Sequence, residues 1–321
     1  MEKYPKITIG ITCFNSEATI RCALQSALLQ DWSNTELIIV DDFSRDETVA
    51  VIKQVIAGFP NATLIKHETN GGPAAARNTI LAAARGEFIA FFDDDDESLP
   101  QRLRTQYERL CAYEAVTGVH LIACYASGVR RYPNQYEIKI QAIGSTPEVP
   151  SGEVVADYLL FNGRRDGVFY GGGTPSCALM ARRSTFEAVG AFDASLRRVE
   201  DVDFAIRLAI AGGHFIGCPE VLYLQHATEG SDKTPLMNLQ AELRLVEKYA
   251  DYLRSKGRYV YARDWFNIRY YHFSCRHFRF LTTLIWFLVR YPIAGMRHLL
   301  RSAPARWLHE RGMGMTGGGP P

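Results

Sequence analysis

The chain has 321 residues, of which 47% are hydrophobic and 22% charged, and its formal net charge is +1. This composition excludes a disordered or low-complexity chain, and the length predicts one large domain or one domain with an appendage. The seven cysteines form no Cys-x-x-Cys pair. We therefore expect reduced thiols in a cytoplasmic protein, without a disulfide framework or a structural zinc site.

The small net charge hides an asymmetry along the chain. Residues 254–311 hold twelve Lys or Arg against two acids, whereas the first 253 residues hold 24 against 33. A basic, aromatic segment behind an acidic body predicts contact with something anionic. The N-terminus lacks the pattern of a secretory signal, and the longest apolar run near the C-terminus, residues 281–289, is much shorter than the ~20 residues of a membrane span.

The first hundred residues predict strands that alternate with helices. The expected strands are 7–13, 36–40, 63–66 and 88–92, and the expected helices are 17–29, 47–56 and 73–84. This alternation predicts a mostly parallel sheet, in which ligands bind at the carboxyl ends of the strands. Acidic residues follow two of the four strands there, at Asp41–Asp42 and Asp93–Asp96.

The rest of the chain predicts mixed elements and then helices. The expected order is a helix at 99–117, a strand at 119–130, an irregular polar loop or small hairpin at 131–165, a strand at 176–181, and helices at 183–189 and 201–211. A strand, turn and strand at 214–226, a long helix at 236–256 and largely helical structure at 260–311 follow. The glycine-rich residues 312–321 predict a disordered end.

Four consecutive carboxylates, Asp93–Asp96, directly follow the apolar strand 88–92. Each pair of like charges at about 4 Å costs on the order of 1 kcal/mol even in water unless a cation lies among them. Alternate residues of an extended segment point the same way, so Asp93 and Asp95 could reach one metal ion. Carboxylate oxygens suit Mg²⁺ or Mn²⁺ shared with substrate phosphates. A solvated acidic loop is the alternative, and the position at the end of a buried strand favours the metal site.

Five motifs, in order, resemble those of family 2 glycosyltransferases. They are ITCFN at 11–15, VDDFSRDET at 40–48, NGGPAAARN at 70–78, FFDDDDESLP at 91–100 and VEDVDFAIRL at 199–208. The resemblance implies the α/β GT-A fold, a Rossmann-like, mostly parallel central sheet with flanking helices. We expect this catalytic domain at 1–230, with a donor half at about 5–110 and an acceptor half at about 111–230, and a basic, aromatic, mainly helical extension at 231–311.

The resemblance also implies roles for single residues in binding a nucleotide-sugar donor. Asp41 and Asp42 resemble the pair that contacts the uracil and ribose, for which capping of a turn is the alternative. The other implied donor-binding residues are Phe14, Asn15, Arg77, Asn78, Asp93 and Asp94, and the implied metal ligands are Asp95, Asp93 and His226. Family members usually have a small residue where this chain has Asp94, so which carboxylates bind the metal stays open.

Glu200 and Asp201 resemble the family's ED motif at the start of a helix. The resemblance implies that Asp201 is the general base that takes the proton of the acceptor hydroxyl, and that Glu200 helps to place the acceptor or the pyrophosphate. The alternative is structural, because acids at a helix N-terminus interact favourably with the helix dipole.

The resemblance implies an inverting transfer of a sugar from a nucleotide-sugar, with UDP-sugar favoured, to a hydroxyl of a glycan or lipid-linked acceptor in polysaccharide biosynthesis, with Mn²⁺ or Mg²⁺ as cofactor. A nucleotidyltransferase and a non-catalytic nucleotide-sugar-binding protein are the alternatives. Residues 254–311 predict either peripheral attachment to the anionic inner face of the plasma membrane or a helical cap on the catalytic domain. We expect no nucleic-acid partner, because the acidic body would repel phosphate.

Overall fold

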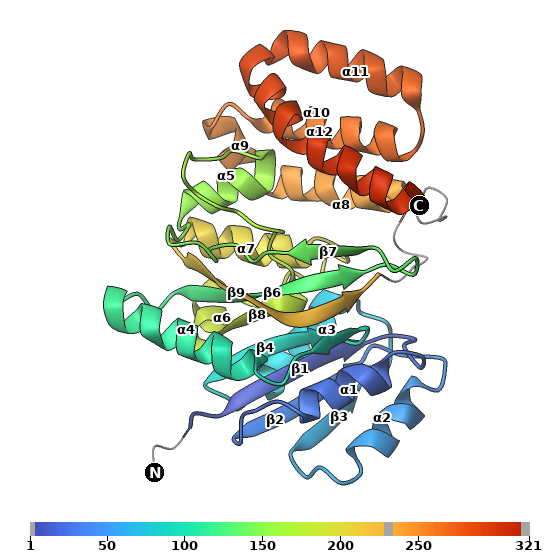
Figure 1. The fold of residues 1–321 in the computed structure, drawn as a ribbon, viewed down its shortest axis with the longest axis vertical. Coiled ribbons are helices and arrows are strands. Elements are labelled where there is room, and N and C mark those ends of the chain that lie inside the picture. Colours follow the sequence, from blue (N-terminus) through green and yellow to red (C-terminus); the bar gives the residue numbers. More distant parts are fainter. Residues whose placement is uncertain (1–3, 228–233, 316–321) are drawn as a thin grey trace. The chain divides into compact units, whose positions relative to one another are not determined.

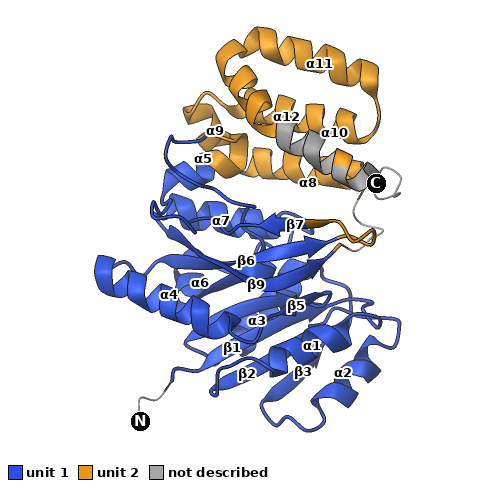
Figure 2. Ribbon diagram, viewed as in Figure 1, with its two compact units in different colours: residues 1–131, 138–156, 164–226 blue, residues 132–137, 157–163, 227–321 orange. Residues whose placement is uncertain are grey.

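The computed structural model describes residues 4–227 and 234–315, which form two compact units (Figures 1 and 2). The first unit comprises residues 1–131, 138–156 and 164–226, and the second comprises 132–137, 157–163 and 227–321. The main change from one unit to the other thus falls after His226, close to residue 230, where we expect the catalytic domain to end. Across the described residues, no helix combines the length and the apolar character needed to cross a membrane.

One mixed sheet organises the first unit, with the strand order β3-β2-β1-β4-β8-β6-β9-β5 and with β7 paired to β6. Its strands are β1 (Ile7–Cys13), β2 (Thr35–Asp41), β3 (Ala62–Lys66), β4 (Phe88–Asp93), β5 (Asp96–Ser98), β6 (Ile122–Arg131), β7 (Glu137–Ile140), β8 (Leu179–Arg182) and β9 (His214–His226). Strands β1 to β4 are all parallel, as the sequence predicts. Strand β8 runs antiparallel between β4 and β6, while β9 is parallel to β6.

Helices flank this sheet. They are α1 (Ile20–Leu28), α2 (Thr48–Ile56), α3 (Pro73–Ala83), α4 (Arg102–Thr117), α5 (Glu153–Phe161), α6 (Arg183–Val189) and α7 (Glu200–Ile210). Because right-handed crossovers connect β1, β2 and β3 in one direction and return to β4 in the other, α1 and α2 cover one face and α3 the other (Figure 1). The mixed α/β architecture with flanking helices confirms the predicted fold class.

Strand β4 lies in the buried centre of the sheet. All its residues from Phe88 to Phe92 are buried, as expected of a parallel strand covered on both faces. On the neighbouring strand, a Cβ atom added at Gly10 would lie 2.6 Å from Cγ2 of Ile80. Glycine therefore lets α3 approach the sheet closely, and this places the N-terminal turn of α3 beside the carboxyl ends of β1 and β4.

Several elements differ from the sequence-based expectations. The stretch 131–165, expected to be an irregular loop or a small hairpin, contains β7, which pairs with β6, and also the helix α5. Helix α5 was not expected, and it buries Val155, Ala156 and Leu160 at helical spacing. The short strand β5 lies inside the acidic cluster and pairs with β9, which continues from His214 to His226 through a bulge rather than a turn. The expected strand at 176–181 begins as a 3₁₀ turn, Ser176–Ala178, before β8.

Helices build the second unit, which confirms the predicted helical extension. They are α8 (Pro235–Lys248), α9 (Ala250–Ser255), α10 (Tyr259–Phe273), α11 (His277–Arg290) and α12 (Pro292–Met315). A break at Tyr249 divides the single helix expected at 236–256. The core of this unit forms around Tyr261, Ile268 and Phe287. Helix α12 continues to Met315, into the segment 312–321 for which the sequence predicts disorder, and residues 316–321 lie outside the described part of the chain.

Candidate active site at the carboxyl edge of the sheet

The carboxyl end of β2 is built around two buried aspartates. Asp42 accepts hydrogen bonds from the backbone N–H of Gly71, at 2.9 Å, and of Gly72, at 2.7 Å. Its Oδ1 also lies 2.8 Å from Nδ1 of His67. Asp42 thus fixes the loop in which Gly72, at φ +84°, precedes the first turn of α3. Asp41 accepts a longer hydrogen bond, from the N–H of Ser44 at 3.3 Å.

The residues after β1 connect the ends of the neighbouring strands. The N–H of the exposed Phe14 donates to Oδ2 of Asp94 at 3.2 Å. Asn15 has a left-handed backbone, with φ +50°; its N–H donates to Oγ of Ser44 and its side-chain oxygen accepts from the N–H of Arg45. The predicted donor-binding residues Phe14 and Asn15 therefore lie against the acidic clusters that follow β4 and β2.

The acidic cluster between β4 and β5 holds carboxyl groups that resist ionisation. Burial, together with the neighbouring charges of Asp95 and Asp93, raises the pKa of Asp94 to about 7. Burial likewise raises the pKa of Asp96 to about 8. The pKa of Asp93 is also raised, mainly by burial, while the charge of Arg77 opposes that rise. A cation at this place would stabilise the ionised form of all these groups.

The donor atoms of this cluster fit an oxygen-preferring divalent cation in part. Ligand atoms of Asp93, Asp96 and Cys177 lie within 4.8 Å of one another. Oδ1 of Asp96 is buried and has no hydrogen-bond partner among the described residues. A bound divalent cation would provide a partner for this oxygen. The Cys177 thiol suits such an ion poorly, because burial holds its pKa well above the ordinary value. His226, an expected ligand, instead places Nε2 2.9 Å from Oε1 of Glu97.

Arg77 connects the acidic cluster to the ED motif. From α3, its Nη1 donates to Oε1 of Glu200 at 2.5 Å, and its Nη2 lies 3.4 Å from Oδ1 of Asp93. Both Arg77 and Glu200 are buried. The next residue, Asp201, has a pKa raised to about 7 by burial and by the charge of Glu200, with Arg77 opposing. The candidate base therefore titrates near neutral pH, where a general base is most effective.

The backbone just before the ED motif is strained. Val199, the residue before α7, has φ +59° and ψ +17°. This left-handed conformation is a genuine outlier for a β-branched residue and costs on the order of 1–3 kcal/mol. Such strain persists only where the surrounding structure imposes it. Here it directs the first turn of α7 toward Arg77.

Asn78 uses both polar groups of its side chain within the protein. Its Nδ2 donates to the carbonyl oxygen of Phe192 at 2.8 Å, and its Oδ1 accepts from the N–H of the same residue at 2.8 Å. The side chain thus holds the segment that leads to the ED motif. This contact places Asn78 beside the expected site in a positioning role.

The structure adds residues that the sequence analysis does not single out. Arg102 is fully buried and donates to Oγ of Ser98 and to the carbonyl oxygen of Phe91, so it fixes both ends of the acidic turn. The hydroxyl of Tyr125 is buried without a hydrogen-bond partner among the described residues, and the charge of Asp201 contributes to its raised pKa. An arginine in a polar helix and a tyrosine in the middle of a strand carry no sequence signal that separates them from surface and core residues.

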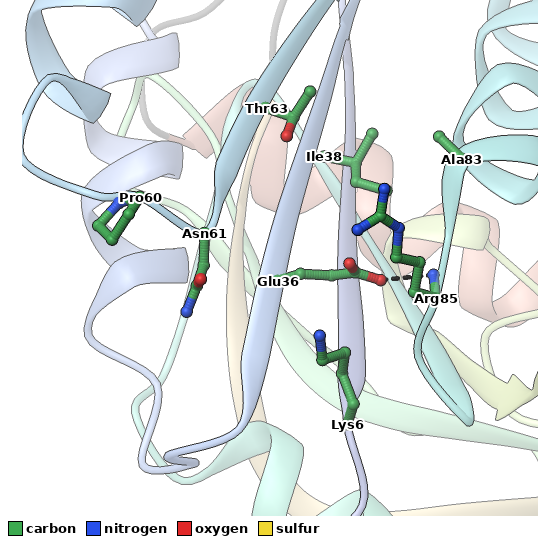
Figure 3. Close-up of a pocket in the computed structure, with 8 residues that line it drawn as sticks. All are labelled: Lys6, Glu36, Ile38, Pro60, Asn61, Thr63, Ala83 and Arg85. Carbon is green, nitrogen blue, oxygen red and sulfur yellow. Dashed lines mark hydrogen bonds between the residues drawn. The ribbon is translucent and has the colours of Figure 1, made fainter.

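A pocket lies at the opposite edge of the sheet, shown in Figure 3. It is lined by Lys6, Glu36, Ile38, Pro60, Asn61, Thr63, Ala83 and Arg85. The carboxylate of Glu36 accepts from the N–H groups of Arg85 and Gly86, so it is used to hold the loop before β4. The pocket lies by the amino-terminal halves of β1 and β2 and contains none of the predicted site residues.

Comparison with known proteins identifies the family. A sequence model described as glycosyl transferase family 2 matches residues 8–185, and this range contains four of the five motifs completely. The chain belongs to glycosyl transferase family 2. The resemblance inferred from the motifs is thereby confirmed.

Two curated relatives share the body of the chain. The succinoglycan biosynthesis protein ExoO of Rhizobium meliloti (strain 1021) is 30% identical over 231 residues, which cover 72% of this chain and 63% of ExoO. The minor teichoic acid biosynthesis protein GgaA of Bacillus subtilis (strain 168) is 28% identical over 233 residues, which cover 70% of this chain and 48% of GgaA. The chain thus spans less than two thirds of the length of either relative.

A solved structure has the same fold. Residues 1–349 of TarS from S. aureus, crystallised in complex with UDP-GlcNAc, superpose with a TM-score of 0.60 at 18% sequence identity. The match covers 88% of this chain and 80% of that one. This likeness confirms the GT-A architecture expected from the motifs.

Proposed function

We propose that the protein transfers a sugar from a nucleotide-sugar, with UDP-sugar as the favoured donor, to a hydroxyl group of a glycan or lipid-linked acceptor, with inversion at the anomeric carbon. The observation that carries the proposal is the buried chain of contacts from Asp93 through Arg77 to Glu200, beside Asp201 with its pKa of about 7. It brings a donor-side carboxylate and a candidate base into one site.

The nucleoside would bind at the ends of β1 and β2. Asp41 and Asp42 are placed there with Phe14 and Asn15, and Asp42 already orders the loop before α3. The TarS complexes with UDP and UDP-GlcNAc support a uridine nucleotide as the donor of this chain. Arg77 would then position the groups around the diphosphate, while Asn78 would hold the segment at Phe192 that leads to the ED motif.

A divalent cation, Mn²⁺ or Mg²⁺, fits the carboxylates of the acidic cluster. Asp93 and Asp95 would hold it, as the motif implies, and the ligand atoms of Asp93 and Asp96 lie within 4.8 Å of each other. His226 would reach the ion only after leaving Glu97. When bound, such an ion neutralises negative charge on the departing diphosphate. The chain itself holds these carboxylates in position. Arg102 contributes through its hydrogen bonds to Oγ of Ser98 and to the carbonyl oxygen of Phe91, on either side of the cluster.

The transfer would be a single displacement. Asp201 takes the proton of the acceptor hydroxyl as its oxygen forms a bond to the anomeric carbon, and the bond from that carbon to the diphosphate oxygen breaks on the opposite face. The electron pair of the broken bond leaves with the nucleoside diphosphate. Glu200, held by Arg77, keeps the first turn of α7 in place and raises the pKa of Asp201, which makes it a stronger base.

The names of the relatives support a role in glycan synthesis. ExoO acts in succinoglycan biosynthesis and GgaA in minor teichoic acid biosynthesis, as their names state. We infer that this chain likewise acts in the synthesis of a surface polysaccharide, at the cytoplasmic side of a membrane. Residues 254–311 would provide contact with an anionic membrane surface.

Isothermal titration calorimetry with UDP, GDP, TDP and NAD, each with and without Mn²⁺, tests the donor site. We expect UDP to bind, more tightly with Mn²⁺, and the effect of Mn²⁺ to disappear in Asp95→Asn. The exposed Asp31, which pairs with Arg104 on the surface, provides the matched control Asp31→Asn. Turnover of UTP and a sugar 1-phosphate would instead indicate a nucleotidyltransferase, and UDP-sugar binding without any turnover a non-catalytic binding protein.

A further inference from the structure

Helix α11 exposes an apolar stripe on the side away from its core. Phe278, Leu281, Ile285 and Val289 recur at positions i, i+3, i+7 and i+11, which place them on one face of a helix. All four are exposed, with Phe278 at 81% and Val289 at 67%. Trp286, beside this stripe, is 66% exposed.

The opposite face of α11 packs into the hydrophobic core of the second unit. Phe287 is buried in the cluster with Tyr261 and Ile268, and Phe280 and Leu284 pack against the same cluster. A helix that is apolar on both faces normally lies between two apolar layers. The core formed by the second unit accounts for one of these layers only.

Arginine residues surround the exposed stripe. From residue 265 to residue 309 the chain contains seven arginines and no Asp or Glu. Arg276, Arg279 and Arg290 flank or belong to α11 and are exposed. Arginine stems can lie along an apolar surface while their guanidinium groups reach the phosphates of lipid headgroups. Positive charge around an apolar stripe complements the negative surface of a bilayer that contains anionic lipid.

The apolar exposure continues onto α12. Ile293, Met296 and Leu300 recur at i, i+3 and i+7 and are exposed, with Leu300 at 67%. Arg297 lies among them and is also exposed. Two successive helices thus present apolar stripes with arginines beside them and no acid before Glu310, a composition typical of helices that lie in the interfacial region of a bilayer.

We propose that α11 binds the surface of an anionic bilayer, lying parallel to it with Phe278, Leu281, Ile285 and Val289 inserted below the headgroups. Trp286 lies at the headgroup level, where the amphipathic indole ring is favoured. The arginines around the stripe contact lipid phosphates and make binding dependent on anionic lipid and on salt. This inference deepens the membrane contact proposed for residues 254–311, and it does not depend on sugar transfer because its observations come from the second unit alone.

Flotation of the full-length protein with vesicles of phosphatidylglycerol and phosphatidylcholine, compared with phosphatidylcholine alone, tests the proposal. We expect binding to the anionic vesicles only, reduced on the order of tenfold by Ile285→Glu. Val116→Glu is the matched control, since Val116 is an isolated, 86% exposed apolar residue on α4 in the first unit. A blue shift of tryptophan fluorescence on anionic vesicles, lost in Trp286→Phe, would show insertion of this residue.

Equal flotation of Ile285→Glu and wild type, or no flotation of the wild type, would overturn the proposal. Sedimentation equilibrium without vesicles covers the alternative that a second copy occupies the stripe: a dimer that Ile285→Glu converts to monomer would also overturn it. Calorimetry with UDP on both variants separates this question from the proposed function, because the donor site lies in the first unit and its affinity should stay unchanged.

Discussion

Arg77 donates to Glu200 over 2.5 Å, although 123 residues separate the two in the sequence. The bond joins the first turns of α3 and α7, and both side chains are buried. Through its other nitrogen the same guanidinium approaches Asp93 at the end of β4. A planar group with separate donors can hold two carboxylates in fixed positions, which a single ammonium group cannot do. Arg77 therefore holds the acidic cluster and the ED motif in their positions relative to each other.

Replacement of Arg77 by Met should destabilise the protein strongly. It leaves Glu200 and Asp93 without their cation, and loss of one partner from a buried ion pair costs about 3–5 kcal/mol. Urea unfolding followed by circular dichroism measures this loss. Arg183→Met removes an exposed ion pair with Glu187 on α6 and should cost less than about 1 kcal/mol. Equal losses in the two variants would show that the Arg77 contacts are not a structural constraint.

Asn78→Ala separates a positioning role from a donor contact. The substitution leaves the buried N–H and carbonyl groups of Phe192 unpaired, and we expect a loss of about 2 kcal/mol in the free energy of unfolding. UDP affinity, measured by calorimetry below the unfolding temperature, should stay nearly the same. A large loss of UDP affinity with unchanged stability would instead place Asn78 in direct contact with the donor.

Val199→Gly tests the strain before the ED motif. Glycine adopts φ +59° without a steric penalty, so we expect the free energy of unfolding to stay the same or rise by about 1 kcal/mol. Val202→Gly, made within α7, provides the control and should lose about 1 kcal/mol, because glycine is unfavourable in a helix. Thermal unfolding of both variants measures the difference. Destabilisation of Val199→Gly as large as that of Val202→Gly would contradict the strain.

Tyr125→Phe removes a buried hydroxyl that has no partner among the described residues. We expect stability to be unchanged or raised by about 1 kcal/mol, while loss of a hydroxyl that interacts electrostatically with Asp201 slows sugar transfer. Tyr261→Phe provides the contrast, since the Tyr261 hydroxyl forms a hydrogen bond with Nδ1 of His298. This variant should lose about 1 kcal/mol in the free energy of unfolding. A stability loss in Tyr125→Phe would show that its hydroxyl is already paired.

Much of the fold is predictable from the sequence because its local signals agree. The run Phe88–Phe92 and the Asn70-Gly71-Gly72-Pro73 turn each indicate a strand or a helix start that the structure contains. Strand β5 could not be predicted, since Asp96–Ser98 is strand only through its pairing with β9. Helix α5 was missed because polar residues and glycines surround its short apolar pattern.

The sequence predicts a set of site residues but not the contacts among them. The motifs point to Asp42, Arg77 and Glu200. Only the fold shows that Asp42 accepts hydrogen bonds from the loop before α3 and that Arg77 donates a hydrogen bond to Glu200. The predicted metal ligand His226 contacts Glu97, a pairing that follows from the register of β5 and β9 rather than from any local pattern. Arg102 and Tyr125 become visible as site residues only once their burial is known.

The pH dependence of UDP-sugar turnover tests the central claim that Asp201 is the base. Burial raises its pKa from 3.8 to about 7, so the carboxyl is protonated and inactive at low pH, and turnover should rise through about pH 7 and then level off. Glu200→Gln removes a charge that raises this pKa, so the midpoint should move to lower pH.

The most direct measurement compares UDP release by wild type and by Asp201→Asn across a panel of UDP-sugars, with UDP binding measured on the same samples. We predict that Asp201→Asn binds UDP as the wild type does but releases it from UDP-sugars on the order of 10²–10⁴ times more slowly, without the pH midpoint near 7. Turnover by Asp201→Asn at the wild-type rate, with the same pH profile, would contradict the account.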